Sequence, residues 1–337
     1  MNKDNNIDEL FSDQMEDVIK NEIKKKRNKL NLKLIIISIV STLIVIIVGV
    51  VALNFASDKY INYAYSKDSE LQKLEYDIMH PNEYIGKESC RETGYFKFES
   101  TYEYGKRLGS KVIYAGSDNY LGGLSKNGVS INGWILGQYP INDTIDKRTS
   151  NVYGLRNLHF LYPYVQYGKY IHEFIDEENK ILENDEETKV NDFGLLNEID
   201  DNKIVEMALS FDKEYIYEDI NKLIDNKLIT FYWVDNNSEE EKQRVIEART
   251  PAFDVVGIKS ASKPGQFEHG LNNLRENFKE TVRKLKEIGH DQYVENINEN
   301  NFKISGIVVV GSPKELKAIQ NNSMIKHAVL GTVVDKY

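Results

Sequence analysis

Residues 34–53, with the sequence LIIISIVSTLIVIIVGVVAL, decide how this chain of 337 residues is organised. None of these 20 residues is charged, and 15 of them are Leu, Ile or Val. A helix rises about 1.5 Å per residue, so this run is as long as the ~30 Å hydrocarbon core of a bilayer. An isolated segment in lipid must satisfy its own backbone hydrogen bonds, which only a helix achieves. The sequence therefore predicts a single transmembrane helix over 34–54.

Two other interpretations of this segment are a cleaved signal peptide and a buried helix of a soluble domain. A signal peptide has a shorter basic region, a shorter apolar run and a cleavage site of small residues. Here 33 residues precede a run of full length. A buried soluble helix almost always keeps a polar face, and 34–53 has none. Both alternatives are therefore less favoured than a membrane span.

The charges that flank the span predict its orientation. Seven of the eight basic residues that precede it lie within 20–33, at Lys20, Lys24, Lys25, Lys26, Arg27, Lys29 and Lys33. Only Lys59 and Lys67 follow closely. Because cytoplasmic flanks carry the excess of Lys and Arg, we expect a cytoplasmic N-terminus, a single pass through the cell membrane and an extracellular C-terminus. The aromatic residues that suit the outer interface are Phe55, Tyr60, Tyr63 and Tyr65.

Charge and cysteine usage limit what the extracellular part can be. The chain has a net charge of −10, and residues 58–337 carry 35 Lys and Arg against 46 Asp and Glu. This acidic balance excludes nucleic acid as a partner of that part. Cys90 is the only cysteine, so no disulfide forms within the chain. A large extracellular domain without disulfides, rich in Asn, Ile and Lys, is typical of a Gram-positive bacterium.

The segment before the span, 1–33, divides into an acidic half and a basic half. Its apolar residues recur at the spacing of one helical face, at Ile7, Leu10, Phe11, Met15 and Val18. Acidic residues occupy the opposite face and are repelled by anionic lipid, so we expect a protein partner to cover the apolar face. The alternative is a frayed tail without a partner.

The basic half follows directly, and its most concentrated residues are Lys24, Lys25, Lys26 and Arg27. Each such charge near an anionic membrane surface contributes about 1 kcal/mol of binding free energy. We therefore expect these four residues to lie against lipid headgroups.

The sequence after the span predicts an α+β fold with two domains. Residues 55–170 begin with a helix over 58–80 and continue as a mainly β region, with short runs at 95–104, 111–114 and 134–136. An acidic linker is expected over 171–194. Residues 195–337 alternate between strand and helix patterns and predict a mixed α/β sandwich-like domain. Its expected strands are 204–211, 228–234, 253–260, 304–310 and 325–334, and its expected helices are 217–224, 271–288 and 313–320.

No known catalytic or metal-binding motif is present. The six histidines lack metal-ligand spacing, and there is no G-x-S-x-G elbow, P-loop or dinucleotide fingerprint. We therefore expect neither enzyme activity nor a cofactor, although a site assembled only in three dimensions stays open as an alternative. Trp134 and Trp233 suit either a sugar-binding surface or a buried core, and the core is the commoner role.

The turn Gly311-Ser312-Pro313-Lys314-Glu315 admits two interpretations. Free amide groups at a helix start can bind an anion. Ser312 at the N-cap with Glu315 three residues later also makes a capping box, which satisfies the same amides within the chain. We favour the capping box.

Several short motifs occur in a specific order along 7–120 and 195–334. In the first region these are Asp8-Glu9-Leu10-Phe11, the basic cluster, the apolar span and Pro81-Asn82-Glu83-Tyr84-Ile85-Gly86. In the second they are Leu195-Leu196-Asn197-Glu198-Ile199, Val205-Glu206-Met207-Ala208-Leu209-Ser210-Phe211-Asp212, Phe231-Tyr232-Trp233-Val234-Asp235, Val310-Gly311-Ser312-Pro313-Lys314-Glu315-Leu316 and Leu330-Gly331. In this order the chain resembles the membrane-bound sigma factor regulators of Firmicutes, which carry an N-terminal and a C-terminal regulator domain.

The resemblance implies an anti-sigma factor, a binding protein without a cofactor. Its cytoplasmic segment is then expected to hold an extracytoplasmic-function sigma factor at the membrane. Its extracellular part is expected to sense an envelope signal through a ligand or a partner protein. The alternatives are a membrane-anchored envelope protein unrelated to transcription and a cell-surface hydrolase with a hidden site.

The predicted orientation can be tested by cysteine labelling of intact cells. A membrane-impermeant thiol reagent is expected to label Cys90, which follows the span. In a Cys90→Ser background, Ser12→Cys is expected to stay unlabelled until the cells are opened. Labelling of position 12 in intact cells, with none beyond residue 57, contradicts the predicted orientation.

Overall fold

The computed structural model describes residues 5–124, 130–131, 158–162, 190–244, 249–260 and 271–336. For residues 5–14, 130–131, 243–244, 249 and 271–272 it gives the backbone only. Two compact units are distinguished. One comprises residues 1–62 with 94–96, and the other comprises residues 63–93 with 97–337.

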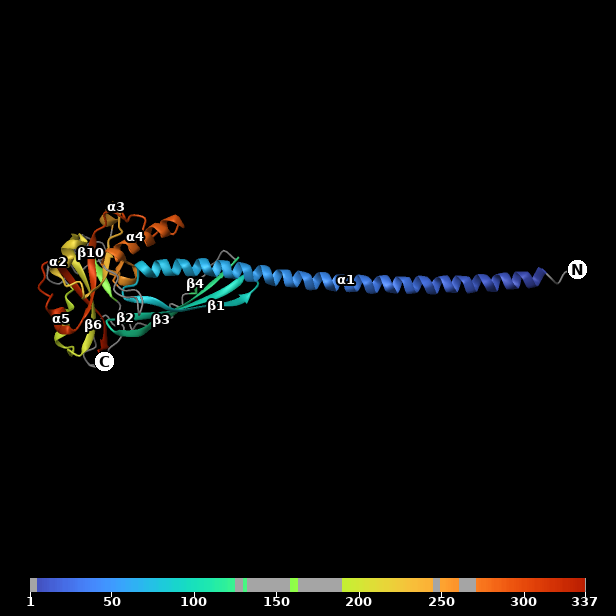
Figure 1. Cartoon of the computed structure of the whole chain (residues 1–337), viewed down its shortest axis with the longest axis horizontal. Coiled ribbons are helices and arrows are strands. Elements are labelled where there is room, and N and C mark those ends of the chain that lie inside the picture. The colour runs from blue at the N-terminus through green and yellow to red at the C-terminus, as the bar shows by residue number, and fades with distance from the viewer. Residues whose placement is uncertain are drawn as a thin grey trace, which may run out of the picture. The chain divides into compact units, whose positions relative to one another are not determined.

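Helix α1 (Asn5–Ile78) is a single helix of 74 residues (Figure 1). It joins the three helical segments that the sequence predicts separately, because the chain has no proline before Pro81 and one glycine, Gly49, inside the helix. It is long and apolar enough to cross a membrane, and its most apolar window has no buried residues. The helix ends two residues before His80, which has a φ of 54° and precedes Pro81.

The predicted β region is a four-stranded sheet in the order β1-β2-β3-β4. Its strands are β1 (Glu83–Gly94), β2 (Lys97–Leu108), β3 (Lys111–Gly123) and β4 (Ser130–Ile131). The expected run at 95–104 is wrong at its start, because Tyr95 and Phe96 form the loop between β1 and β2. The expected run at 134–136 lies outside the described residues. Cys90 is exposed on β1, as the labelling test requires.

The last turns of α1 pack against this sheet. Asp68 accepts hydrogen bonds from the hydroxyls of Ser100, at 3.1 Å, and Tyr102, at 2.8 Å. Ser69 donates to Glu88 at 2.7 Å. Figure 1 shows β1, β2 and β3 running beside the C-terminal part of α1. The residues of α1 from 63 onward therefore belong to the folded part that follows the apolar span and not to a free stalk.

The C-terminal region contains a five-stranded antiparallel sheet in the order β11-β6-β10-β7-β9. Its strands are β6 (Lys203–Tyr215), β7 (Ile229–Val234), β9 (Val256–Lys259), β10 (Ile304–Gly311) and β11 (Ile325–Asp335). The helices are α2 (Tyr217–Leu223), α3 (Glu239–Arg244), α4 (Leu271–Glu287) and α5 (Pro313–Lys317). Shorter elements are the strands β5 (His159–Leu161) and β8 (Arg249–Pro251), and the 3-10 turns η2 (Asp192–Asn197) and η3 (Ala252–Asp254). The α+β class is as predicted, and the five expected strands and three expected helices of this region occur in the expected order. The strand expected at 253–260 is shorter, because 252–254 form the turn η3 and β9 begins at Val256. Helix α3 and the strands β5 and β8 were not predicted.

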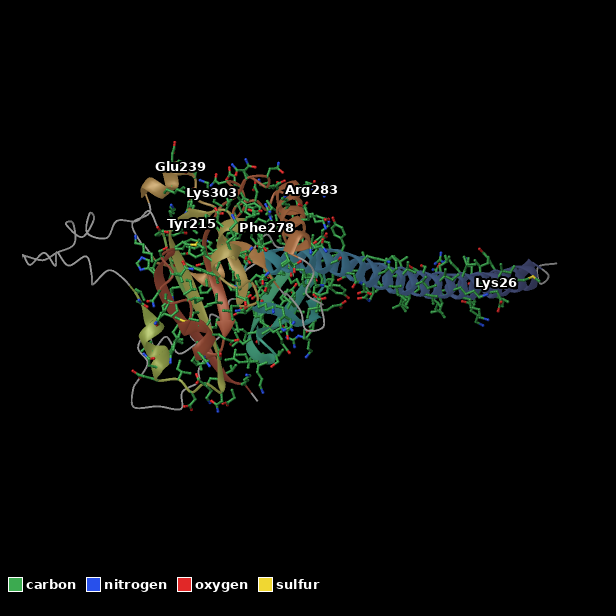
Figure 2. The ribbon with its side chains drawn as sticks, turned by 60° about the vertical axis from the view of Figure 1, so that its left-hand side comes forward. Lys26, Tyr215, Glu239, Phe278, Arg283 and Lys303 are labelled. Carbon is green, nitrogen blue, oxygen red and sulfur yellow. The ribbon has the colours of Figure 1, made fainter. Side chains whose placement is uncertain are left out.

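Alternating side chains of this sheet fill two cores. On one face, Met207 and Leu209 belong to the cluster that also contains Phe278 of α4. In Figure 2, Phe278 and Arg283 mark α4, and of the two only Phe278 is buried. On the other face, Trp233 packs with Phe160 at a ring distance of 4.8 Å. Trp233 is fully buried, which supports the core role predicted for it, whereas Trp134 lies outside the described residues.

The turn before α5 is a capping box, as predicted. The Ser312 hydroxyl accepts a hydrogen bond from the Glu315 amide, and the Glu315 carboxylate accepts one from the Ser312 amide at 2.8 Å. These amides are therefore satisfied within the chain, and the anion-site alternative is not supported. Most of the acidic linker expected over 171–194 lies outside the described residues, and the domain boundaries at 170 and 195 stay predictions.

Candidate functional site

The end of α1 meets the C-terminal sheet in a buried cluster of charged and aromatic side chains, which we call the junction. Its members are Tyr76, His80, Asn82, Glu83, Lys106, Glu206 and Lys259. They come from the last turn of α1, the turn that follows it, and strands β1, β2, β6 and β9. The junction therefore joins segments that lie far apart in the sequence.

Glu206 is the most constrained member, because its carboxylate is fully buried. One oxygen, Oε2, lies 2.9 Å from Lys106 Nζ and accepts a hydrogen bond from the Thr332 amide at 3.2 Å. The other, Oε1, accepts one from Asn82 Nδ2 at 2.7 Å. A buried charge needs such partners, because its removal from water otherwise costs several kcal/mol. This cost is comparable to the net stability of a whole domain.

Gly331 has no side chain, and the Glu206 carboxylate occupies the space beside it. A Cβ atom at this position would lie 2.8 Å from Glu206 Oε2 and 2.5 Å from a methyl group of Leu158. A side chain therefore does not fit at 331 without displacing the Glu206 carboxylate.

Lys106 stays charged in this setting. Burial opposes its charge, but the carboxylates of Glu206 and Glu83 outweigh burial and raise its pKa. Its Nζ lies 3.8 Å from Glu83 Oε1, so it faces one carboxylate from β6 and one from the start of β1. Lys106 therefore ties the sheet beside α1 to the C-terminal sheet.

Lys259 holds the end of α1 from the other side of the junction. Its amino group donates hydrogen bonds to the Tyr76 carbonyl, one of the last carbonyls of the helix, and to the Glu83 carbonyl at 2.8 Å. The last turn of a helix leaves such carbonyls without helical partners, so Lys259 acts as a cap supplied from a distant strand. Burial lowers the pKa of Lys259 to about 7, and the negative charges of Asp77 and Glu83 offset only part of this effect.

An aromatic stack fills the space between these charged groups. The Tyr76 ring lies between His80, at 4.1 Å between centroids, and Tyr104, at 4.6 Å. Burial and then the charges of Lys259 and Lys106 lower the pKa of His80, so its ring is neutral at pH 7.

The backbone of the turn is strained. His80 and Asn82 both have positive φ, at 54° and 63°. Such conformations cost about 1–3 kcal/mol each and persist only where the surroundings fix them. The stack on Tyr76 and the hydrogen bond to Glu206 supply that fixation.

Two further contacts secure the same end of the helix. Glu75 Oε1 lies 2.7 Å from His290 Nε2, beyond α4. Ile78 and Met79 are buried in the main apolar core of the C-terminal sheet. These contacts fix the end of α1 to the C-terminal sheet. Among the described residues no cluster of potential metal ligands is present.

The structure places the sequence-predicted partner face on α1. Met15 and Val18 are 70% and 62% exposed and lie three residues apart on the helix. Ile7, Leu10 and Phe11 lie on its helical backbone, and their side chains are outside the described residues. The contact of these residues with a sigma factor stays a prediction.

The predicted membrane-surface residues Lys24, Lys25, Lys26 and Arg27 are all exposed on α1. Lys26 is labelled in Figure 2, where its side chain projects from the helix surface. Their contact with lipid also stays a prediction.

The junction was not predicted from the sequence. Charged residues inside otherwise apolar strands were the available signal, since Glu206 follows Val205 and Lys259 follows Ile258. Such residues are rarely buried unless they are paired. The sequence does not show which residues pair with them.

Comparisons with known proteins agree with this arrangement. The family model described as sigma factor regulator N-terminal matches residues 20–113, and the one described as sigma factor regulator C-terminal matches residues 196–332. The chain belongs to this sigma factor regulator family, which confirms the resemblance. The junction joins the two matched regions, because Lys106 lies in the first and Glu206 and Lys259 in the second.

A relative in this family is the probable anti-sigma-M factor YhdL of Bacillus subtilis (strain 168). The two proteins are 24% identical over 218 residues, which cover 58% of this chain and 59% of that protein. This chain thus aligns with less than two thirds of its relative's length. No solved structure matches the chain.

Removing the Lys106 charge is expected to destabilise the folded part that contains the junction strongly. Lys106→Met leaves the Glu206 carboxylate buried without its counter-ion, and such a loss costs about 3–5 kcal/mol. The measurement is denaturant unfolding of the full chain in detergent, followed by tryptophan fluorescence. Adding Glu206→Met should recover part of the loss.

Lys87→Met is the matched control, because Lys87 on β1 pairs with Glu103 at 3.1 Å but is 67% exposed. That change should cost less than about 1 kcal/mol. Equal effects of Lys106→Met and Lys87→Met contradict the buried ion pair.

The lowered pKa of Lys259 predicts a specific pH dependence. Between the folded pKa of about 7 and an unfolded value of about 10.4, the unfolded chain binds more protons than the folded one. Stability relative to Lys259→Met should therefore rise with pH across this window, by up to about 1.4 kcal/mol per pH unit. Below pH 7, Lys259 is protonated in both the folded and the unfolded chain, so the difference in unfolding free energy between wild type and Lys259→Met should be constant. A difference in unfolding free energy between wild type and Lys259→Met that does not change between pH 7 and pH 10 contradicts the lowered pKa of Lys259.

Proposed function

We infer that this chain is a membrane-anchored anti-sigma factor that holds an extracytoplasmic-function sigma factor at the cell membrane and responds to an envelope signal. One observation carries the proposal. A single uninterrupted helix, α1, has exposed apolar residues such as Met15 and Val18 near its N-terminal end, an apolar span in its middle and the buried junction at its C-terminal end. Each of the three regions suits one of the three tasks.

The proposed sigma factor contact is the face formed by Ile7, Leu10, Phe11, Met15 and Val18. An amphipathic helix that binds a groove uses anchors at this spacing. Met15 and Val18 are exposed to solvent, as a free docking face requires. This face precedes residue 20, where the family match begins, so the assignment depends on the residue pattern and not on the match.

The proposed membrane anchor is the span at 34–54, with the N-terminus in the cytoplasm. The large apolar side chains between Leu34 and Leu53 are 41–69% exposed, and lipid is the solvent that suits such a surface. Lys24, Lys25, Lys26 and Arg27 would then lie at the cytoplasmic headgroups, in agreement with the excess of basic residues on that side.

The proposed transmission step uses the junction. A ligand or partner protein that shifts the C-terminal sheet must move Glu206 and Lys259, which hold Asn82 and the last turn of α1. An uninterrupted helix passes such a movement toward its other end without a hinge, because it has no proline or flexible loop to absorb it.

The sigma factor contact is tested with Leu10→Ala combined with Phe11→Ala. Large apolar anchors dominate helix-in-groove binding, so the loss of two should cost about 2–4 kcal/mol, or at least ~30-fold in affinity. The full chain should then lose its sigma factor on purification, identified by mass spectrometry, and transcription of that factor's target genes should rise.

The matched control is Glu9→Ala or Glu16→Ala on the polar face, which should change binding little because exposed charges contribute little affinity. Membrane insertion should be unchanged in all variants. Retention of the sigma factor by the double alanine variant places the contact elsewhere. Absence of any sigma factor from the wild-type complex favours an envelope-binding protein unrelated to transcription.

A further inference from the structure

The loop between β1 and β2 has an unusual composition. It consists of two aromatic residues, Tyr95 and Phe96, and Phe96 has a φ of 56°. Two-residue hairpin loops that need positive φ normally use Gly, Asn or Asp, since a bulky side chain is strained in this conformation. An aromatic residue that accepts this strain indicates a constraint beyond turn formation.

Contacts with α1 fix the loop in place. The Phe96 amide donates a hydrogen bond to the Ser57 hydroxyl at 2.8 Å, and Ser57 is only 3% exposed. The Phe96 ring packs edge-on against Tyr60, with 5.8 Å between centroids. These contacts lie within one compact unit, which also contains the apolar part of α1. The loop is therefore attached to a known position on the helix that would cross the membrane.

The position of Ser57 sets the depth of the loop in a bilayer. Ser57 comes four residues after Leu53, where the apolar run ends. That separation is about 6 Å along the helix axis, whereas the headgroup layer on each side of the hydrocarbon core is roughly 5–8 Å thick. A hydrogen bond to Ser57 therefore places the Phe96 amide within the headgroup layer.

Tyr95 is the loop residue that is free to contact lipid. It is 51% exposed, whereas the neighbouring Phe96 is directed to Tyr60. Phe55 of α1 is 64% exposed and lies about 160° around the helix from Ser57. The loop, which is bound at Ser57, and the exposed Phe55 thus lie on opposite sides of the helix and two residues apart along it.

We propose that the Tyr95–Phe96 loop is a second membrane contact, in which the Tyr95 ring lies among the lipid headgroups of the outer leaflet. The inference rests on the membrane anchoring proposed above. Tyrosine favours this layer because its ring is apolar and its hydroxyl can bond to water and headgroups. Lipid is the partner that fits, because the hydrogen bond to Ser57 holds the loop at that depth whatever else binds the extracellular part.

This contact gives the extracellular part a direct dependence on the membrane. With Phe55 on the opposite side, Tyr95 restricts the tilt of α1, since interfacial aromatic residues set how a span lies in the bilayer. Strand β2 begins directly after the loop, at Lys97, and also carries Lys106 of the junction. A change in headgroup packing would therefore act on the chain segment that binds Glu206.

The test measures depth with nitroxide labels on the full chain in phospholipid nanodiscs. In a Cys90→Ser background, labels are placed at Tyr95→Cys, at Ile46→Cys in the apolar span and at Tyr114→Cys, an exposed tyrosine of β3. The readout is the collision rate with oxygen relative to that with a water-soluble nickel complex. The expected result is a deep label at 46, an interfacial label at 95 and an aqueous label at 114.

An aqueous label at 95 with a deep label at 46 overturns this inference and leaves the membrane anchor intact. An aqueous label at 46 shows that the chain does not span, so both proposals fail. A second measurement retains the Tyr95 ring and places the label at Glu92→Cys, in β1 just before the loop. Tyr95→Ser should then increase exposure of that label to the nickel complex, whereas Tyr114→Ser should not. Equal responses to the two changes also overturn the inference.

Discussion

The buried carboxylate of Glu206 requires three separate parts of the chain to come together. Its oxygens are satisfied by Lys106 from β2, by Asn82 from the turn after α1 and by the Thr332 amide from β11. If any of these segments is absent, a charge is left without partners in a place that water does not reach. The contribution of such a pair to net stability is small, but removing one partner is expensive. The junction therefore specifies one arrangement of the end of α1, strand β2 and the C-terminal sheet.

The same arrangement makes the end of α1 part of the core of the C-terminal sheet. Ile78 and Met79 pack into the main apolar cluster, while Lys259 binds the carbonyl of Tyr76. Apolar packing resists separation of the parts, and the directed bonds to carbonyl and carboxylate groups resist rotation between them. A helix held in both ways moves with the sheet. This property gives the family's two matched regions a physical connection, because the junction residues lie in both.

Local patterns predicted much of the fold. The apolar periodicity of 271–288 corresponds to α4 (Leu271–Glu287), and the capping residues Ser312 and Glu315 start α5 as expected. The strand expected to begin at 95 begins at Lys97, since contacts of Phe96 with Ser57 and Tyr60 outweigh the strand preference of aromatic residues. The sequence did not predict the continuity of α1, because the change from acidic to apolar residues along it indicates separate elements.

The sequence by itself determined the length of the apolar span and the order of the main strands and helices of the C-terminal region, and it predicts an apolar face at 7–18. Each of these depends on residues within a few turns of one another, so spacing and composition are enough. Only the tertiary structure decided which charges are buried and paired. Asn82 and Glu206 are 124 residues apart, and no local pattern links them. Whether a charged residue is solvated or buried depends on which segment packs over it. Glu206 is covered by the turn that contains Asn82, and Lys259 by the last turn of α1, and both of these segments lie more than 120 residues earlier in the chain.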